Sequence, residues 1–181
     1  MKIGIIGNGF VGKATNILEN DNVELVIYDI DPKLCSPEGT TLNDICKTDI
    51  VFISVPTPMN KDGSCHTDIV ESVIKEIDTH ANGLQIVVIK STVPPGTTDR
   101  LNEKYGSVNV IFNPEFLTEA NFIEDFKNQT RIILGGTRKG TNLLRQVYSK
   151  VFPTAHIIKT GSITAEMVKY MTNSYLATKV S

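Results

Sequence analysis

Short apolar runs alternate along the chain with stretches of helical pattern, and this alternation limits the fold more than any other feature. Seven β-rich runs are expected to form strands, at residues 2–6, 24–28, 49–55, 85–89, 108–112, 131–134 and 156–158. Four stretches between them are expected to form helices, at residues 11–18, 67–78, 97–103 and 142–151. Because VFISV and IVVI are continuously apolar, the pattern predicts a doubly wound parallel sheet of the α/β class with both faces covered.

The composition suits one globular domain that acts on small molecules. Of the 181 residues, 40% are apolar and 21% are charged, and the net charge of −2 comes without a long basic run. A nucleic-acid stripe and a polybasic membrane anchor are therefore not expected. The N-terminal apolar run is too short for a membrane span and passes directly into a glycine loop, which predicts a cytoplasmic protein. Cys35, Cys46 and Cys65 show no metal-binding or disulfide pattern and are expected to be reduced.

A glycine motif, Gly7-x-Gly9-x-x-Gly12, follows the first expected strand and opens the first helix. Such glycines permit a tight turn and let a pyrophosphate approach the free amide groups of a helix N-terminus. Asp29 ends the second strand 20 residues after Gly9, where a carboxylate accepts hydrogen bonds from ribose hydroxyls and repels a 2′-phosphate. The motif therefore predicts a Rossmann-type sheet that binds NAD rather than NADP.

Three further loops follow the third, fourth and fifth strands: VPTP at 55–58, STVPPGTT at 91–98 and NPEFLTEAN at 113–121. Because ligands bind outside the carboxyl ends of parallel strands, we expect these loops and the glycine loop to line one crevice. Locally, the last of them is typical of a helix start, with Asn113 as N-cap and Pro114 in the first turn. This pattern would place Glu115 and Glu119 on one helix face.

The sequence after Gly161, SITAEMVKYMTNSYLATKVS, is typical of one long helix opened by Ser162 or Thr164. Glu166, Lys169 and Asn173 follow one another at helical spacing and share a face. A lysine and an asparagine so placed could stabilise a developing oxyanion. Spacing alone nevertheless favours a solvated, ion-paired stripe. The expected helix has no stop signal, which predicts that the structural unit continues beyond residue 181.

Six motifs in order resemble the UDP-glucose/GDP-mannose dehydrogenase family: GNGFVG with Asp29, VPTP, STVPPGTT, NPEFLTEA, RIILGG and AEMVKYMTNSYLATKVS. They cover essentially the whole chain. The resemblance implies an NAD-dependent enzyme that oxidises the C6 alcohol of a nucleotide sugar to a carboxylate in two hydride transfers. The implied path runs through an aldehyde and a cysteine-bound thioester, with UDP-glucose as the default substrate, UDP-glucuronate as its product and a homodimer as the full-length protein.

By position, the resemblance implies cofactor contacts and catalytic residues. The implied NAD contacts are Gly7, Asn8, Gly9, Phe10, Val11, Gly12, Asp29, Lys33, Thr57, Thr92 and Glu119. Among the catalytic residues, Glu115 would be the base for thioester hydrolysis and Thr92 would position the water. Lys169 and Asn173 would stabilise oxygen charge at C6. The implied substrate contacts are Glu115, Phe116, Leu117, Thr118, Glu119, Lys169 and Asn173.

The chain departs from the family at the nucleophilic cysteine, which the family carries in a GxCxxKD segment that has no counterpart here. We therefore expect an NAD-binding Rossmann domain at 1–160 and the start of the central dimerisation helix at 161–181. The C-terminal nucleotide-sugar domain would be absent. Such a chain is expected to bind NAD without finishing the reaction.

Two alternatives stay open. A relative of the 6-phosphogluconate and β-hydroxyacid dehydrogenases would also carry a Lys-x-x-x-Asn pair on the helix after its dinucleotide domain. VPTP and NPEFLTEA count against it, because a single oxidation needs no glutamate for thioester hydrolysis. The second alternative is a non-catalytic NAD-binding module, which would bind NAD but form no NADH.

Overall fold

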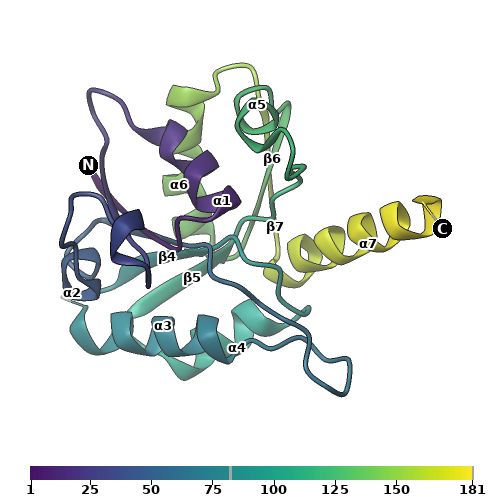
Figure 1. Cartoon of the computed structure of the whole chain (residues 1–181), viewed down its shortest axis with the longest axis horizontal. Coiled ribbons are helices and arrows are strands. Elements are labelled where there is room, and N and C mark those ends of the chain that lie inside the picture. The colour runs from purple at the N-terminus through teal and green to yellow at the C-terminus, as the bar shows by residue number, and fades with distance from the viewer. Residues whose placement is uncertain (82, 181) are drawn as a thin grey trace.

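The computed structural model describes residues 1–81 and 83–180, and a seven-stranded sheet runs through its centre (Figure 1). The strands are β1 (Lys2–Ile6), β2 (Glu24–Tyr28), β3 (Ile50–Ile53), β4 (Gln85–Ile89), β5 (Val108–Phe112), β6 (Arg131–Gly135) and β7 (His156–Thr160). All seven expected strands are confirmed. The interior strands β3, β4 and β5 are buried along their whole length, which is why their sequences are continuously apolar.

Within the described residues, six α-helices and two 3₁₀ turns lie between the strands, and a seventh α-helix follows β7. The helices are α1 (Phe10–Thr15), α2 (Leu42–Ile45), α3 (Asp68–His80), α4 (Thr97–Lys104), α5 (Phe122–Lys127), α6 (Arg138–Val151) and α7 (Ser162–Val180). The 3₁₀ turns are η1 (Asn16–Leu18) and η2 (Pro32–Leu34). The five expected helices correspond to α1 with η1, α3, α4, α6 and α7. The short helices α2 and α5 were not predicted, because four to six residues show too few turns for a helical period.

The strand order is β2-β1-β3-β4-β5-β6-β7, and the five strands from β2 to β5 are parallel. The chain passes from β1 to β2 on one side and then returns to β3 on the other side of β1. In a doubly wound sheet this reversal opens a crevice at the carboxyl ends of the two strands, where ligands bind. The strand order therefore opens this crevice between the β1 and β3 loops.

The expected doubly wound parallel sheet is confirmed, with one antiparallel step. β6 pairs with β5 in antiparallel fashion at Phe112 and Gly135, while β6 and β7 are parallel to each other. A parallel strand would need a connection that carries the chain back across the sheet. The segment between β5 and β6 instead stays near the carboxyl edge, where Phe122 at the start of α5 packs on Phe10 beside the glycine loop, with ring centroids 5.3 Å apart.

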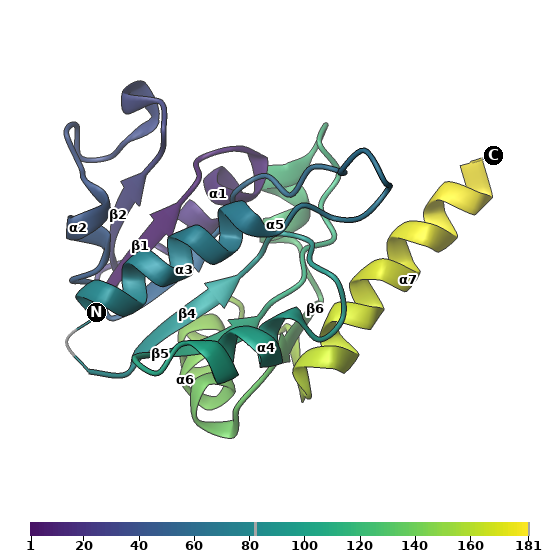
Figure 2. The same ribbon diagram turned by 90° about the horizontal axis from the view of Figure 1, so that it is seen from below.

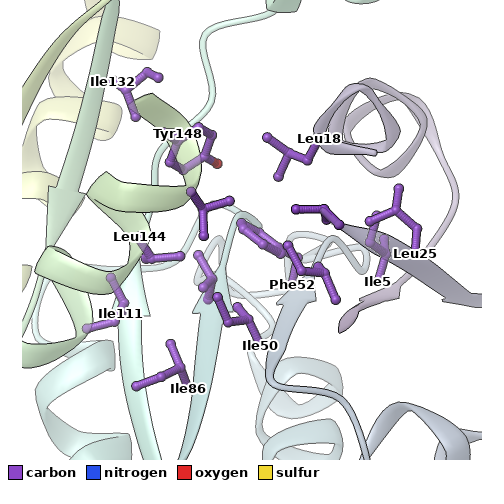
Figure 3. Close-up of a cluster of buried hydrophobic side chains, with 14 of the residues drawn as sticks. Ile5, Leu18, Leu25, Ile50, Phe52, Ile86, Ile111, Ile132, Leu144 and Tyr148 are labelled. Carbon is purple, nitrogen blue, oxygen red and sulfur yellow. The ribbon is translucent and has the colours of Figure 1, made fainter. Parts of the chain in front are cut away.

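Two apolar layers cover the sheet, one on each face. In one layer, α1, α5 and α6 contribute Ala14, Phe126 and Tyr148 to a cluster with strand residues such as Phe52. Figure 3 shows Tyr148 and Phe52 within this cluster. In the other layer, α2, α3, α4 and the first turn of α7 contribute Ile45, Ile74, Leu101 and Ala165. Both faces of the sheet are thus filled, and the carboxyl edge remains for a ligand.

Helix α7 leaves the domain after its first turns (Figure 2). Its start is seated on β6, where a Cβ on Gly135 would lie 2.4 Å from the Cβ of Ala165. Farther along, Met171, Tyr175 and Leu176 are exposed. In residues 1–81 and 83–180, none of the helices combines the length and the hydropathy that a bilayer crossing requires.

Candidate active site

The glycine loop is shaped by contacts that leave no room for side chains at two positions. Gly7 has a φ of +90°, and a Cβ there would lie 2.5 Å from the carbonyl oxygen of Ser54 in the β3 loop. A Cβ on Gly12 would lie 2.0 Å from the carbonyl oxygen of Gly7. Gly9 differs, because no atom lies within 4 Å of where its Cβ would be. Gly7 and Gly12 are therefore required by packing, and Gly9 leaves an open surface at the N-terminus of α1.

Asp29 lies beside this loop, as the motif predicts. Its Oδ2 accepts a hydrogen bond from the Asn8 N–H at 2.7 Å, and its Oδ1 accepts one from the Asp31 N–H at 2.9 Å. The Asn8 side chain donates to the carbonyl oxygen of Leu34 at 2.8 Å, which holds the segment after β2 against the glycine loop. Lys33 in this segment is exposed. A carboxylate so placed fits the ribose end of a dinucleotide and disfavours a 2′-phosphate.

The proline loops after β3 and β4 meet beside the glycine loop. A cavity of about 230 Å³ lies between them. It is lined by Val11, Ser54, Val55, Pro56, Thr57, Lys90, Ser91, Thr92, Glu115, Leu117 and Lys169. Val11, Thr57, Thr92, Glu115 and Lys169 come from five separate segments, and all five were predicted from the sequence. The expected convergence of the four strand-end loops is confirmed by this lining.

Two larger cavities adjoin the first through shared residues. Thr57 and Thr92 also line a cavity of about 410 Å³ between the β3–α3 loop and α7, to which Asn173 contributes. Glu115 and Leu117 also line a cavity of about 540 Å³, with Phe116 and Thr118 on its wall. Glu115 therefore lies where the 230 Å³ cavity on the glycine-loop side meets the 540 Å³ cavity on the α5 and β6 side.

The helix start predicted at Asn113 is wrong. Residues 113–118 form no helix, and α5 begins only at Phe122. Asn113 is buried, and its side chain accepts from Lys90 Nζ at 3.0 Å and from the Tyr148 hydroxyl at 2.5 Å. These tertiary partners occupy the oxygen that an N-cap would offer to its own helix. Glu115 and Glu119 consequently do not share a helix face.

Glu115 is fixed in this loop by a buried ion pair. Its Oε2 lies 2.7 Å from the Nζ of Lys90, and the side chains of the two residues are 9% and 1% exposed. Burial by itself would lower the Lys90 pKa, but the attraction of the Glu115 carboxylate, with a further contribution from Tyr148, outweighs it and raises this pKa. The pair holds one carboxylate oxygen of Glu115 and leaves the residue on the wall of two cavities.

Lys169 reaches the same loop from α7. Its Nζ donates to the backbone carbonyl of Glu115 and lies 5.4 Å from the centroid of the Phe116 ring. Burial lowers the pKa of Lys169, the Glu115 carboxylate raises it, and the nearby Lys90 lowers it further, so the net direction is downward. Glu166 is fully buried, whereas Asn173 is exposed. The solvated-stripe interpretation is therefore wrong for Glu166 and Lys169.

The remaining predicted residues differ in their placement. Phe10 and Phe116 are exposed, and the hydroxyl and N–H of Thr118 both donate to Asp125 Oδ2, at 2.6 and 2.8 Å. Glu119 is exposed and does not line the three cavities described above. The structure thus brings Glu115, Lys169 and Thr92 together and leaves Glu119 outside these three cavities.

Sequence patterns missed Lys90 and Tyr148. Lys90 follows the apolar run IVVI directly, and a lysine at the end of a buried strand is a signal that could have marked it. Tyr148 lies on the apolar face of α6, where an aromatic residue is expected for packing alone. No local signal separates it from a plain core residue.

Comparison with known proteins identifies the family. The model of the UDP-glucose/GDP-mannose dehydrogenase family, NAD binding domain, matches residues 38–152. UDP-glucose 6-dehydrogenase of Rickettsia bellii is 32% identical over 216 residues, with 100% of this chain and 50% of the relative covered. UDP-glucose 6-dehydrogenase TuaD of Bacillus subtilis is 31% identical over 217 residues, with 99% and 47% covered.

Among solved structures, a GDP-mannose dehydrogenase from Pseudomonas aeruginosa superposes with a TM-score of 0.87 at 28% identity, covering 99% of this chain and 51% of that one. The chain thus spans about half the length of the curated relatives it matches. The family model starts after the glycine motif, and the alignments with the relatives cover that motif as well. These matches confirm the resemblance and the expected NAD cofactor. The chain belongs to the UDP-glucose/GDP-mannose dehydrogenase family and contains its NAD binding domain.

Proposed function

We propose that the whole protein oxidises a nucleotide sugar at C6 with NAD, converting UDP-glucose to UDP-glucuronate in two steps and four electrons, and that this chain supplies the NAD-binding half. One observation carries the proposal: Glu115 lines both the 230 Å³ cavity at the glycine-loop side and the 540 Å³ cavity beyond it. A cofactor in the first space and a sugar in the second would meet at this residue.

The residues at the glycine-loop side fit a dinucleotide. Gly9 leaves the backbone open, and the Asp29 carboxylate lies against the loop through Asn8. The remaining proposed contacts are Gly7, Phe10, Val11, Gly12, Lys33, Thr57, Thr92 and Glu119. NAD would supply the acceptor for the hydride that leaves the sugar carbon. The protein's part is to hold the cofactor's phosphates at the α1 N-terminus and its ribose at Asp29.

The residues around Glu115 divide the chemistry between charge stabilisation and proton transfer. Lys169 carries a positive charge in a half-buried position, where it stabilises a developing oxyanion more strongly than in water. Asn173, one turn farther along α7, would donate a hydrogen bond to the same oxygen. Glu115 would take the proton from a water that Thr92 positions, because both residues line the 230 Å³ cavity. Phe116, Leu117 and Thr118 would contact the sugar.

UDP-glucose is proposed over other nucleotide sugars because relatives over 30% identical bear the name UDP-glucose 6-dehydrogenase, although a solved structure with 28% identity is a GDP-mannose dehydrogenase.

We propose the domain division 1–160 and 161–181, of which residue 181 lies outside the described residues. A homodimer is proposed for the full-length protein, since Met171, Tyr175 and Leu176 on α7 are exposed. The cytoplasm is proposed as its location.

The test measures NADH formation and NAD binding together. The chain is incubated with NAD and UDP-glucose, alone and with the C-terminal half of the Rickettsia bellii relative supplied in trans. Two NADH formed per UDP-glucose consumed, in the presence of the second half, would support the proposal. One NADH per sugar would indicate a single-oxidation dehydrogenase. NAD binding without NADH in either mixture would favour a non-catalytic module.

A further inference from the structure

Glu166 is a buried carboxylate to which the proposed reaction gives no role. Its Oε2 accepts a hydrogen bond from the Gly96 N–H at 2.6 Å. Its Oε1 accepts from the Thr98 N–H at 2.8 Å and from the Thr98 hydroxyl at 2.6 Å. Gly96 is the N-cap of α4 and offers no side chain of its own. The side chain that caps α4 is therefore supplied by α7, from 68 to 70 residues farther along the chain.

Burying the Glu166 carboxylate costs free energy, and its hydrogen bonds fix a specific geometry. Glutamate is rarely fully buried, and burial raises the pKa of Glu166, although the three hydrogen bonds from Thr98 and Gly96 counteract this. The amide groups and the positive end of α4 compensate the buried negative charge. An apolar residue would satisfy packing alone, so the carboxylate indicates that the junction of α4 and α7 is held in one geometry.

The two helices joined by Glu166 carry different parts of the site. α4 directly follows the 91–96 loop, which contains Thr92. α7 carries Lys169 and Asn173 three and seven residues after Glu166, on the same face. Two further contacts hold the start of α7: Ser162 donates to Asp99 in α4, and Ala165 packs on Gly135. Beyond Lys169 the helix becomes exposed, so Glu166 is the last deeply buried side chain before the proposed catalytic pair.

We propose that Glu166 is a positioning residue: by capping α4, it fixes the rotation of α7 so that Lys169 reaches the Glu115 loop while Thr92 lies opposite. This inference rests on the proposed function for its catalytic meaning. The positioning itself is a property of the chain without cofactor and is tested separately.

The test is the titration of Lys169 in the cofactor-free chain. Lysine is labelled with ¹³C, the Lys169 signal is assigned with the Lys169→Arg variant, and its pKa is measured by NMR in the parent chain and in Glu166→Gln. The amide keeps one oxygen for Thr98 but presents an NH₂ group to the Gly96 N–H, which breaks the cap. Loss of position would expose Lys169 and shift its pKa upward, toward its ordinary value.

Glu71→Gln is the matched control. Glu71 also anchors α4, through Arg100 at 2.7 Å and Lys104 at 2.5 Å, but from α3 rather than from α7. An upward shift in Glu166→Gln and no shift in Glu71→Gln would support the proposal. No shift in Glu166→Gln, or equal shifts in both variants, would overturn it. A general loss of packing would lower the thermal stability of both variants and would give Lys169 the same pKa in both.

If Glu166→Gln fails to fold, Thr98→Ala replaces it, because this variant removes only the hydroxyl that donates at 2.6 Å. A smaller upward shift of the Lys169 pKa would support the proposal, and an unchanged titration would overturn it. NAD binding is measured in parallel on the parent chain. A Lys169 shift in a chain that does not bind NAD would sustain the positioning role and contradict the proposed function, so that the two failures are distinct.

Discussion

The carboxylate of Glu115 and the ammonium group of Lys90 form an ion pair at 2.7 Å inside the protein, at the junction of two cavities. Charges are removed from water here at a considerable cost, which only good geometry and further hydrogen bonds offset. Asn113 supplies such a bond to Lys90 at 3.0 Å. The pair therefore places a fixed carboxylate where the proposed reaction needs a base.

Replacing Lys90 with methionine is expected to lower the free energy of unfolding by about 3–5 kcal/mol, because it leaves Glu115 as an uncompensated buried charge. Lys127→Met is the control, since Lys127 pairs with Glu124 at 3.0 Å on the surface, with side chains 51% and 65% exposed. Its cost should stay under about 1 kcal/mol. Urea unfolding at neutral pH measures both values, and equal losses would contradict this account of the Glu115 pair.

The glycine loop offers a pair of variants that separates folding from cofactor binding. Gly12→Ala places a Cβ 2.0 Å from the Gly7 carbonyl oxygen and should destabilise the fold strongly. Gly9→Ala meets no atom within 4 Å and should leave the melting temperature nearly unchanged. It should still weaken NAD binding by roughly tenfold or more, where tenfold corresponds to about 1.4 kcal/mol. The added methyl group would occupy the space beside the backbone where the NAD phosphates are proposed to bind. Calorimetry and thermal melting distinguish the two effects, and undiminished NAD affinity in Gly9→Ala would place the cofactor elsewhere.

Sequence patterns were sufficient for most of the fold because the sheet is covered on both faces. A strand such as Gln85–Ile89 is buried at every residue, so its sequence alone marks it. The direction of β6 was not predictable in this way, since the period of a strand is the same in either direction. It depends on the connection through α5, which returns to the carboxyl edge and was itself too short to predict.

Site residues were predictable where a local motif determines their geometry. They were not predictable where contacts with residues distant in the sequence determine the backbone conformation. Gly7, Gly12 and Asp29 lie as the motif requires. Asn113 has the sequence of an N-cap, but Lys90 and Tyr148, 23 and 35 residues away, take its oxygen. The helix preference of the NPE sequence is weak compared with these buried hydrogen bonds. Likewise, the spacing of Glu166 and Lys169 fits a solvated face, and only the position of α4 shows that this face is buried.

Asp29 is predicted to set the choice between NAD and NADP. In Asp29→Asn the side-chain oxygen can still accept from the Asn8 N–H, a bond of 2.7 Å in the parent chain, so the glycine loop should keep its shape. The amide NH₂ group cannot accept from the Asp31 N–H, so that 2.9 Å bond is lost. The variant lacks the negative charge that repels a 2′-phosphate and one acceptor for the ribose hydroxyls. NAD should bind more weakly and NADP more tightly than in the parent chain, as measured by calorimetry. Tighter binding of NADP than NAD by the parent chain would contradict the role of Asp29.

Glu71 is predicted to make stability depend on pH in the acid range. Lys104 and then Arg100 hydrogen-bond its carboxylate and lower the Glu71 pKa, with burial opposing them. Because the folded-state pKa lies below the unfolded value of about 4.3, the ionised group stabilises the fold above that pH. This stabilisation is lost as the pH falls through the folded-state pKa. Glu71→Gln should therefore destabilise the chain at pH 7 and match the parent in strong acid. Urea unfolding of both chains across this range provides the test, and a difference that persists at the acid end would show that packing, rather than charge, holds α3 to α4.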